Sequence, residues 1–286
     1  MSFLTNVLVI ALTEQAPLIL AAVGFTLIFY LNGFINVAYA ENITLGAYFA
    51  VVFNTIMGLN FYLTIIPAAL LSGLVSVITF LLVFRPALKR GVGKAEMIVL
   101  SVGLSFFMRY ATKLAFGAQL RLFDIAKPSY WMVFGTGVTS YQITALALVV
   151  AIAVGLYLFI YKTNYGEIMR ALANNENLAL VSGINPTKVS VLIWFIAGVA
   201  GGLAGVFFGV TSFVQYIMGW DLILIVIMIS IVGGIGNVRG ALIAGFGAGF
   251  ITVAVTLLTK PLYAQVVLLL LFIGALKARG LQRVRG

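Results

Sequence analysis

The chain contains no cysteine, no histidine and very little charge. Only 8% of its 286 residues are Asp, Glu, Lys or Arg, whereas 63% are hydrophobic and the mean hydropathy is +1.18. The lack of Cys and His excludes disulfides, thiol nucleophiles, haem and thiolate metal sites, and the Ser-His-Asp and Cys-His arrangements of hydrolases. About 25% of the residues of a soluble domain are charged, so the surface of such a domain cannot be built from this composition.

Long apolar runs occupy most of the sequence. Several of them reach the roughly 18 residues that cross a hydrocarbon core of about 30 Å. They are continuously apolar and lack the alternation of outer-membrane barrel strands. The sequence therefore predicts an all-α polytopic membrane protein with about eight to ten transmembrane helices, in one domain over residues 1–286. Within 36–58 and 221–259, both full spans and re-entrant segments fit the pattern. The runs lie at about 5–31, 36–58, 61–84, 96–117, 140–161, 187–214, 221–236, 240–259 and 262–277.

The few charges are mostly basic and lie between the apolar runs. The net charge is +10 and the pI about 9.9, and in a membrane protein such cations set the topology, so we expect no nucleic-acid partner. With nine spans, four basic places share one side: the loop 85–94, the segment 162–188, Arg239 and the tail 277–285. The positive-inside rule makes this side cytoplasmic. The N-terminus is then predicted outside and the C-terminus in the cytoplasm.

A cluster of polar side chains lies within "INVAYAENITLGAY", after the first apolar run. The chain over 32–42 forms either a cytoplasmic turn or a break inside the bilayer that lines a substrate pathway or gate. We favour the pathway role, centred on Glu41, because an ionisable group at membrane depth is energetically expensive and is functional by default. Glu14 and Asp221 are expected near the outer ends of their runs, where water hydrates them. The candidate pathway residues are Asn32, Asn36, Tyr39, Glu41 and Asn42.

The segment between the fifth and sixth runs is too long for a simple loop. Asn164 is a candidate helix cap with Glu167 in the first turn, and Gly183 followed by Pro186 ends the helix. The sequence thus predicts a short cytoplasmic helix within 164–185. Its periodicity fits two roles equally, docking against another protein or lying on the membrane surface as an amphipathic helix.

Glycine recurs at two further places. One set follows GxxxG spacing, which lets helices pack closely within the subunit or between subunits; it comprises Gly198, Gly202, Gly205 and Gly209. The other place, "GGIGNVRG" at 233–240, follows no predicted strand, which excludes a Rossmann site. It is either a tight cytoplasmic turn or a helix break whose backbone lines the pathway. In the second case the candidate pathway residues also include Gly233, Gly234 and Gly236.

Three stretches carry recognisable motifs, in the order "GFTLIFYLNGFINVAYAENITLGAY", the segment 166–185, and "IVGGIGNVRGALIAG". Together they resemble the branched-chain amino-acid permease family of ABC importers, of the leucine/isoleucine/valine high-affinity type and its first permease subunit, over essentially the whole chain. The middle segment resembles the "G…RA.A.n…A…GIN" form of the family's EAA loop, although Asn177 and Leu178 stand where Glu-Ala is usual. Its matching residues are Gly166, Arg170, Ala171, Ala173, Asn174, Ala179, Gly183, Ile184 and Asn185.

The resemblance implies a transport subunit and not an enzyme. In that family the loop matching 164–185 is the coupling helix, which docks into a groove of a cytoplasmic ATPase. No Walker motif occurs in the sequence, so ATP and Mg²⁺ are expected on separate ATPase chains, and this chain is expected to hold no catalytic residue, cofactor or metal. The implied partners are a homologous second permease in a heterodimer, two ATPases, an extracytoplasmic solute-binding protein, and the lipid of a prokaryotic inner membrane.

The implied substrate is leucine, isoleucine or valine. The family commonly reads "NFAHGE" where this chain reads "NVAYAE", with Tyr39 in place of His and Ala40 in place of Gly. This departure leaves urea and short amides, which related permeases carry, as alternatives. An ion-coupled secondary transporter that uses Glu41 as its coupling acid is a further alternative, but it gives no reason for the helix within 164–185.

Overall fold

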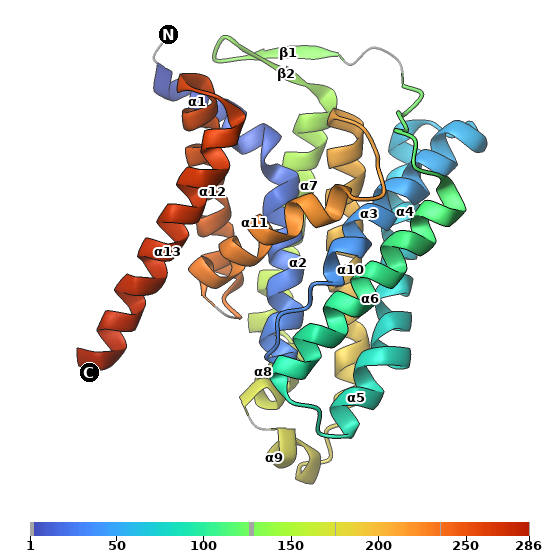
Figure 1. The fold of residues 1–286 in the computed structure, drawn as a ribbon, viewed down its shortest axis with the longest axis vertical. Helices are drawn as coiled ribbons and strands as arrows, with labels where there is room; N and C mark the ends of the chain where they lie inside the picture. Colours follow the sequence, from blue (N-terminus) through green and yellow to red (C-terminus); the bar gives the residue numbers. More distant parts are fainter. Residues whose placement is uncertain (1–2, 126–128, 175, 235, 286) are drawn as a thin grey trace.

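The structure is a computed structural model. It describes residues 3–285 except 126–128, 175 and 235, without the side chains of 176–178, 261 and 278–285. Most of the described chain is helical, with one two-stranded sheet, and the helices pack side by side into an elongated bundle (Figure 1). The prediction of an all-α polytopic membrane protein is confirmed.

Fewer helices have the length and hydropathy of a full span than the nine apolar runs predicted. By length and composition five described helices qualify, or six if one bent pair counts as a single span. Two further apolar helices are shorter, α11 (Met218–Gly233) and the Leu262–Lys277 part of α13 (Pro261–Arg285). The five are α4 (Phe61–Thr79), which continues through η2 (Phe80–Phe84) into α5 (Arg85–Lys89), and then α6 (Lys94–Phe116), α7 (Ser140–Lys162), α10 (Pro186–Thr211) and α12 (Val238–Leu258).

The first apolar run, predicted as one span over 5–31, forms two helices. α1 (Phe3–Glu14) and α2 (Ala16–Asn32) meet at an angle of 52°. Pro17 lies in the first turn of α2 and lacks the N–H that would bond to the preceding turn, so a straight helix cannot run through this point. The second run forms α3 (Tyr39–Val51), continued by the π-helical η1 (Val52–Ile56). Most of α3 is buried inside the bundle.

Helix α10 lies at the centre of the bundle and packs against α2, α3 and α4. A Cβ added to Gly198 or Gly202 would come within 2.4 or 2.5 Å of a serine side chain on α4. A Cβ on Gly205 would lie 1.8 Å from the carbonyl oxygen of Ile43 on α3, and one on Gly209 would lie 2.6 Å from a valine side chain that follows α10. These four glycines therefore lie at close contacts within the subunit.

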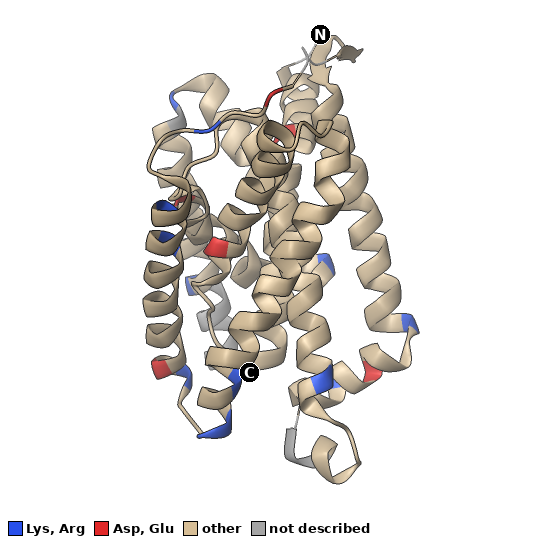
Figure 2. Cartoon of the chain, turned by 90° about the vertical axis from the view of Figure 1, so that its right-hand side faces the viewer, with Lys and Arg blue, Asp and Glu red and all other residues tan. Residues whose placement is uncertain are grey.

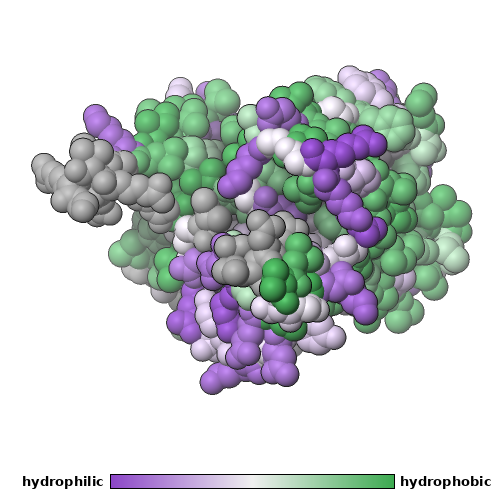
Figure 3. Space-filling model, turned by 90° about the horizontal axis from the view of Figure 1, so that it is seen from below, coloured by the Kyte–Doolittle hydropathy of each residue, from purple (hydrophilic) through white to green (hydrophobic). Residues whose placement is uncertain are grey.

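The two ends of the bundle differ in structure and charge. A hairpin of β1 (Tyr130–Val133) and β2 (Thr136–Thr139) lies at the end that holds the N-terminus, where the sequence predicted no strands (Figure 1). The opposite end carries α5, α8 (Asn164–Asn174) and α9 (Glu176–Val181). Lys and Arg gather towards this second end (Figure 2). Seen from below, hydrophilic side chains cover much of it, whereas the flanks of the bundle are apolar (Figure 3).

The segment 164–185, predicted as one helix, contains the two short helices α8 and α9. Its predicted cap was wrong by one residue, because α8 already includes Asn164 and the Thr163 hydroxyl accepts the hydrogen bond from the Gly166 N–H at 3.2 Å. The predicted end is confirmed. Gly183 adopts a φ of +80°, which suits glycine, and α10 begins at Pro186.

Candidate functional site

The chain between α2 and α3 is a buried break and not an exposed turn. Residues 33–38 are non-helical, and Gly33 ends α2 with a φ of +69°. Non-helical backbone at membrane depth is tolerated where protein covers it and satisfies its polar groups. The Ser101 hydroxyl of α6 does so here: it accepts from the Val37 N–H at 3.0 Å and lies 3.3 Å from the Ile35 carbonyl oxygen. α3 thus starts inside the bundle.

Glu41, in the first turn of α3, forms the one salt bridge found among the described residues. Its side chain is fully buried, and its Oε1 accepts from the Ser105 hydroxyl at 2.7 Å and from Arg109 Nη2 at 3.1 Å. The guanidinium of Arg109 lies 4.0 Å from the centroid of the Trp220 ring, a cation–π contact from α11. We call Glu41, Ser105, Arg109 and Trp220 the ionic centre. It joins three helices that are distant in sequence.

The Glu41 carboxylate of the ionic centre can still accept a further hydrogen bond. Oε2 of Glu41 is buried, and no described residue donates a hydrogen bond to it. Buried polar atoms are normally paired, so an orphaned carboxylate oxygen marks a place where a further donor is accommodated. Arg109 is itself only 5% exposed. Both charges are therefore held away from water in this conformation.

Arg109 was missed by the sequence reasoning. Arg109 stands in the middle of the apolar run 96–117. That position could have marked it as a candidate, because burying a cation in a membrane segment is as energetically expensive as burying Glu41. Asp221 lies at the end of its apolar run, as expected, because it is exposed on the first turn of α11, next to Trp220. The chain returns from the end of α10 into the body of the bundle before α11 begins (Figure 1).

Tyr39 packs between helices, and its hydroxyl bonds to α10 and not to Glu41 or Arg109. Its hydroxyl donates to the Ala197 carbonyl oxygen of α10 at 3.1 Å. The ring is fully buried in a slot that glycines open, because a Cβ on Gly24 would lie 2.2 Å, and one on Gly201 3.0 Å, from the hydroxyl oxygen. The Tyr that stands at the family's His position thus joins α3 to α2 and α10.

The three candidate asparagines differ in their surroundings. Asn32 accepts a hydrogen bond from the Trp194 indole N–H at 2.9 Å. Asn36 and Asn42 are buried, and no described residue bonds to the side-chain oxygen of either. The main-chain carbonyl of Asn42 accepts from the Ser72 hydroxyl of α4 at 2.9 Å. Two orphaned amide oxygens therefore lie close in sequence to Glu41.

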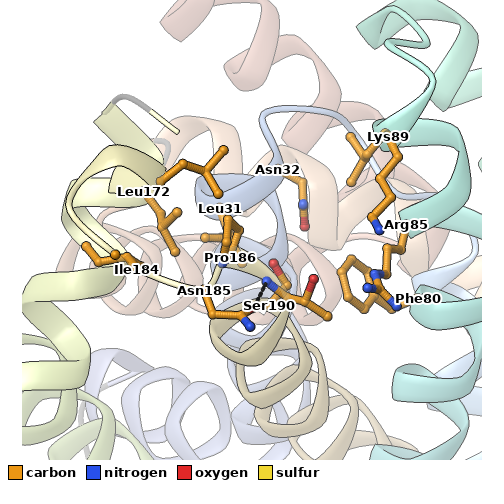
Figure 4. Close-up of a pocket in the computed structure, with 14 residues that line it drawn as sticks. Leu31, Asn32, Phe80, Arg85, Lys89, Leu172, Ile184, Asn185, Pro186 and Ser190 are labelled. Atoms are coloured by element: carbon orange, nitrogen blue, oxygen red, sulfur yellow. Dashed lines mark hydrogen bonds between the residues drawn. The ribbon is translucent and has the colours of Figure 1, made fainter. Parts of the chain in front are cut away.

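A cavity of about 600 Å³ lies at the end of the bundle that carries α8 and α9 (Figure 4). It brings together residues from two separate predictions, because Asn32 of the pathway set and Gly183 and Asn185 of the coupling set all line it. Arg85 and Lys89 of α5 give it a positive wall. We call it the basic cavity.

The predicted coupling residues divide between the two faces of the segment. Gly166 is buried against the end of α7, where a Cβ would lie only 2.2 Å from the Ile160 carbonyl oxygen. Arg170 donates to that same carbonyl and lies 5.8 Å from the Tyr161 ring centroid, so its guanidinium already binds α7. Of the other residues, Ala179 is buried and Ala173 half-buried. Those exposed are Ala171, Asn174, Gly183 and Asn185.

Asn185 also has a structural role. Its side-chain oxygen caps α10 by accepting from the N–H groups of Thr187 and Lys188 at 3.1 and 3.3 Å.

The described part of "GGIGNVRG" forms a tight connection between α11 and α12, with Ile235 outside the described residues. Gly233 is the last residue of α11, and a Cβ on it would lie 2.5 Å from the backbone of α12. Gly234 and Gly236 adopt φ of +96° and +76°. The side chain of Asn237 caps α12 by accepting from the Gly240 N–H at 3.0 Å. These three glycines thus lie apart from the ionic centre in sequence and contacts.

A double-mutant test separates the ion pair from the packing around it. Arg109→Met should lower the free energy of unfolding by about 3–5 kcal/mol, because it leaves the Glu41 carboxylate buried and unpaired. Adding Glu41→Gln to this variant should restore most of that loss. Denaturant unfolding in detergent, followed by tryptophan fluorescence, measures both. A double variant no more stable than Arg109→Met would show that the carboxylate is not the cause.

Comparison with known proteins identifies the family. A family model described as "Branched-chain amino acid transport system / permease component" matches residues 7–276. The probable branched-chain amino acid transport permease protein LivH of Methanocaldococcus jannaschii is 28% identical over 242 residues, which cover 81% of this chain and 75% of that protein.

Bacterial relatives agree. The high-affinity branched-chain amino acid transport system permease protein LivH of Escherichia coli K12 is 26% identical over 80% of this chain and 79% of its own length. BraD of Pseudomonas aeruginosa is 27% identical over 85% of this chain and 83% of its own length. No solved structure matches. The chain therefore belongs to the branched-chain amino acid transport permease family, as the motifs indicated.

Proposed function

We propose that this chain is a transmembrane subunit of an ATP-driven importer for branched-chain amino acids, and that the ionic centre recognises the charged ends of the substrate. The observation that carries the proposal is a buried pair of opposite charges inside a membrane bundle, with one carboxylate oxygen of Glu41 that accepts no hydrogen bond from any described residue. Ionisable groups at such depth mark substrate or ion pathways.

The pair matches the chemistry of a zwitterion. A free amino acid carries an ammonium and a carboxylate. When the ion pair opens, the substrate ammonium can pair with Glu41 and the substrate carboxylate with Arg109. Each charge then keeps a partner throughout, which avoids the penalty of an isolated buried charge. Urea and short amides are neutral and hydrogen-bond without opposite charges, so the centre favours the amino acid over the amide alternative.

An exposed carboxylate next to the ionic centre supports a pathway along α6 and α11. Asp221 is exposed on an apolar helix, next to Trp220. A carboxylate in a membrane segment faces water or protein and not lipid. We infer that this side of the subunit faces a water-filled pathway or the second permease, and that the homologous partner of a heterodimer completes it.

The α8–α9 end is the proposed docking surface for the ATPase subunits, which bind ATP and Mg²⁺. Arg170 ties α8 to the end of α7, and Arg239 at the start of α12 lies 4.6 Å and 5.2 Å from the ring centroids of Tyr157 and Tyr161 on the same helix. A displacement of α8 is therefore transmitted to α7 and α12 as a lever. This end is then cytoplasmic and the hairpin end faces the solute-binding protein, in a multi-pass inner-membrane protein.

The ion-coupled alternative is less consistent with the site. A coupling acid must exchange its proton or ion with water, whereas Glu41 is fully buried and paired with Arg109. That pairing suits recognition of a dipolar solute better than proton transfer.

The first prediction concerns substrate. In cells that carry the whole transporter, Glu41→Gln should reduce uptake of radiolabelled leucine at least about tenfold, because the amide cannot act as counter-ion to the substrate ammonium. Glu14→Gln makes the same chemical change on α1, outside the ionic centre, and should leave uptake intact. Co-purification of partner chains confirms that both variants assemble.

Three outcomes would contradict this account. Normal leucine uptake by Glu41→Gln removes the recognition role of the centre. Uptake of urea without leucine by the unaltered transporter supports the amide alternative. Uptake that a proton ionophore abolishes at constant ATP supports ion coupling.

The second prediction concerns coupling. Ala171→Trp places a bulky side chain on the exposed face of α8 and should abolish co-purification of the ATPase subunits, because a groove that accepts a small residue cannot accept an indole. Leu258→Trp changes another exposed residue, at the end of α12, and is the control. ATPase recovered in normal yield with Ala171→Trp would place the docking surface elsewhere.

A further inference from the structure

We propose that the basic cavity binds the phosphate group of an anionic phospholipid. The cavity of about 600 Å³ is lined by the end of α2, the η2–α5 segment, α8–α9 and the start of α10. This inference rests on Arg85 and Lys89, which belong neither to the ionic centre nor to the predicted coupling set, although Asn32, Gly183 and Asn185 of those predictions also line the cavity.

The charge of the cavity is one-sided. Arg85 and Lys89, four residues apart on α5, line it, and among the residues whose side chains the structure describes no Asp or Glu lines it. Nε of Arg85 is buried and finds no hydrogen-bond acceptor among the described residues. A guanidinium presents a planar fork of donors that matches phosphate oxygens, and an unpaired buried donor is energetically unfavourable until such an acceptor arrives.

The opposite wall adds neutral donors and a favourable field. In Figure 4, Arg85 and Lys89 reach into the cavity from one side, and Asn185 and Ser190 lie on the side opposite. Asn185 and Ser190 belong to the start of α10, whose N-terminal end carries a partial positive charge that attracts anions. The Asn185 side chain already occupies two amides of this turn. The hydroxyls of Thr187 and Ser190 are therefore its donors to a ligand.

An apolar ridge indicates that the phosphate belongs to a lipid and not to a free ion. α4 and η2 run into α5 as one continuous helical stretch of 29 residues, Phe61–Lys89. Its exposed apolar side chains recur every fourth residue and form a ridge that ends three residues before Arg85. An acyl chain lying on this ridge would bring its phosphate to the arginine, in the leaflet where anionic lipids concentrate if this end is cytoplasmic. The ridge comprises Ile66, Leu70, Leu74, Ile78 and Leu82.

Native mass spectrometry of the full chain in detergent tests the site. The chain is titrated with phosphatidylglycerol, with phosphatidylcholine and with inorganic phosphate. We expect one tightly retained phosphatidylglycerol, with weaker binding of the zwitterionic lipid and of free phosphate. Arg85→Gln/Lys89→Gln should weaken retention at least about tenfold, because two charge-assisted contacts are lost. Arg90→Gln/Lys94→Gln removes two exposed cations near the same loop that do not line the cavity, and should change little.

The outcomes separate the possible ligands. Equal phosphatidylglycerol retention by both double variants would overturn the site. Inorganic phosphate that binds as tightly as the lipid would overturn the lipid assignment and leave a free-anion site. If the first double variant does not fold, Lys89→Gln alone, at an exposed position, should still weaken retention by about threefold; unchanged retention there would also overturn the proposal.

Discussion

Burial of an ion pair in a largely apolar bundle is the constraint on which the arrangement of α3, α6 and α11 depends. Neither Glu41 nor Arg109 can face lipid, and neither can be buried alone without a large penalty. Glu41 therefore sits in the first turn of α3, where the helix dipole favours a carboxylate, and meets Arg109 and Ser105 from α6. Trp220 covers the guanidinium from α11. The break before α3 is what allows this first turn to lie inside the protein.

The rest of the subunit is organised around α10. Its glycines let the backbones of α3 and α4 approach, and Gly201, together with Gly24 of α2, opens the slot that holds Tyr39. The same helix starts at the basic cavity, where its cap residue Asn185 lies beside the proposed docking segment α8–α9. The proposed recognition centre and the proposed docking surface are thus both fixed to elements that contact α10, which gives motion at one end a structural route to the other.

Much of the architecture could be predicted from the sequence, because membrane spans are set by length and hydropathy and those are visible in a single chain. The helical segment within 164–185 was located by its Gly and Pro boundaries, and the family by its motifs. Hydropathy could not show that Pro17 divides the first run or that 221–236 forms a shorter helix, since both depend on geometry. Glu41 was selected because burying a charge inside a membrane is energetically expensive. Its partner Arg109 was not identified, because the contact between α3 and α6 appears only in the three-dimensional structure. The hairpin at 130–139 was missed, since its turn depends on the positive φ of Phe134 and Gly135, which the residue types alone did not indicate.

One measurement tests most directly whether the ionic centre opens during transport. The chain has no cysteine, so Ser105→Cys introduces a single thiol at a fully buried position next to Glu41. In the assembled transporter, a membrane-impermeant thiol reagent should leave this chain unlabelled at rest and label it during ATP-driven leucine uptake. A thiol that stays unlabelled while uptake proceeds at the normal rate would show that the centre remains closed, and the pathway would then lie elsewhere.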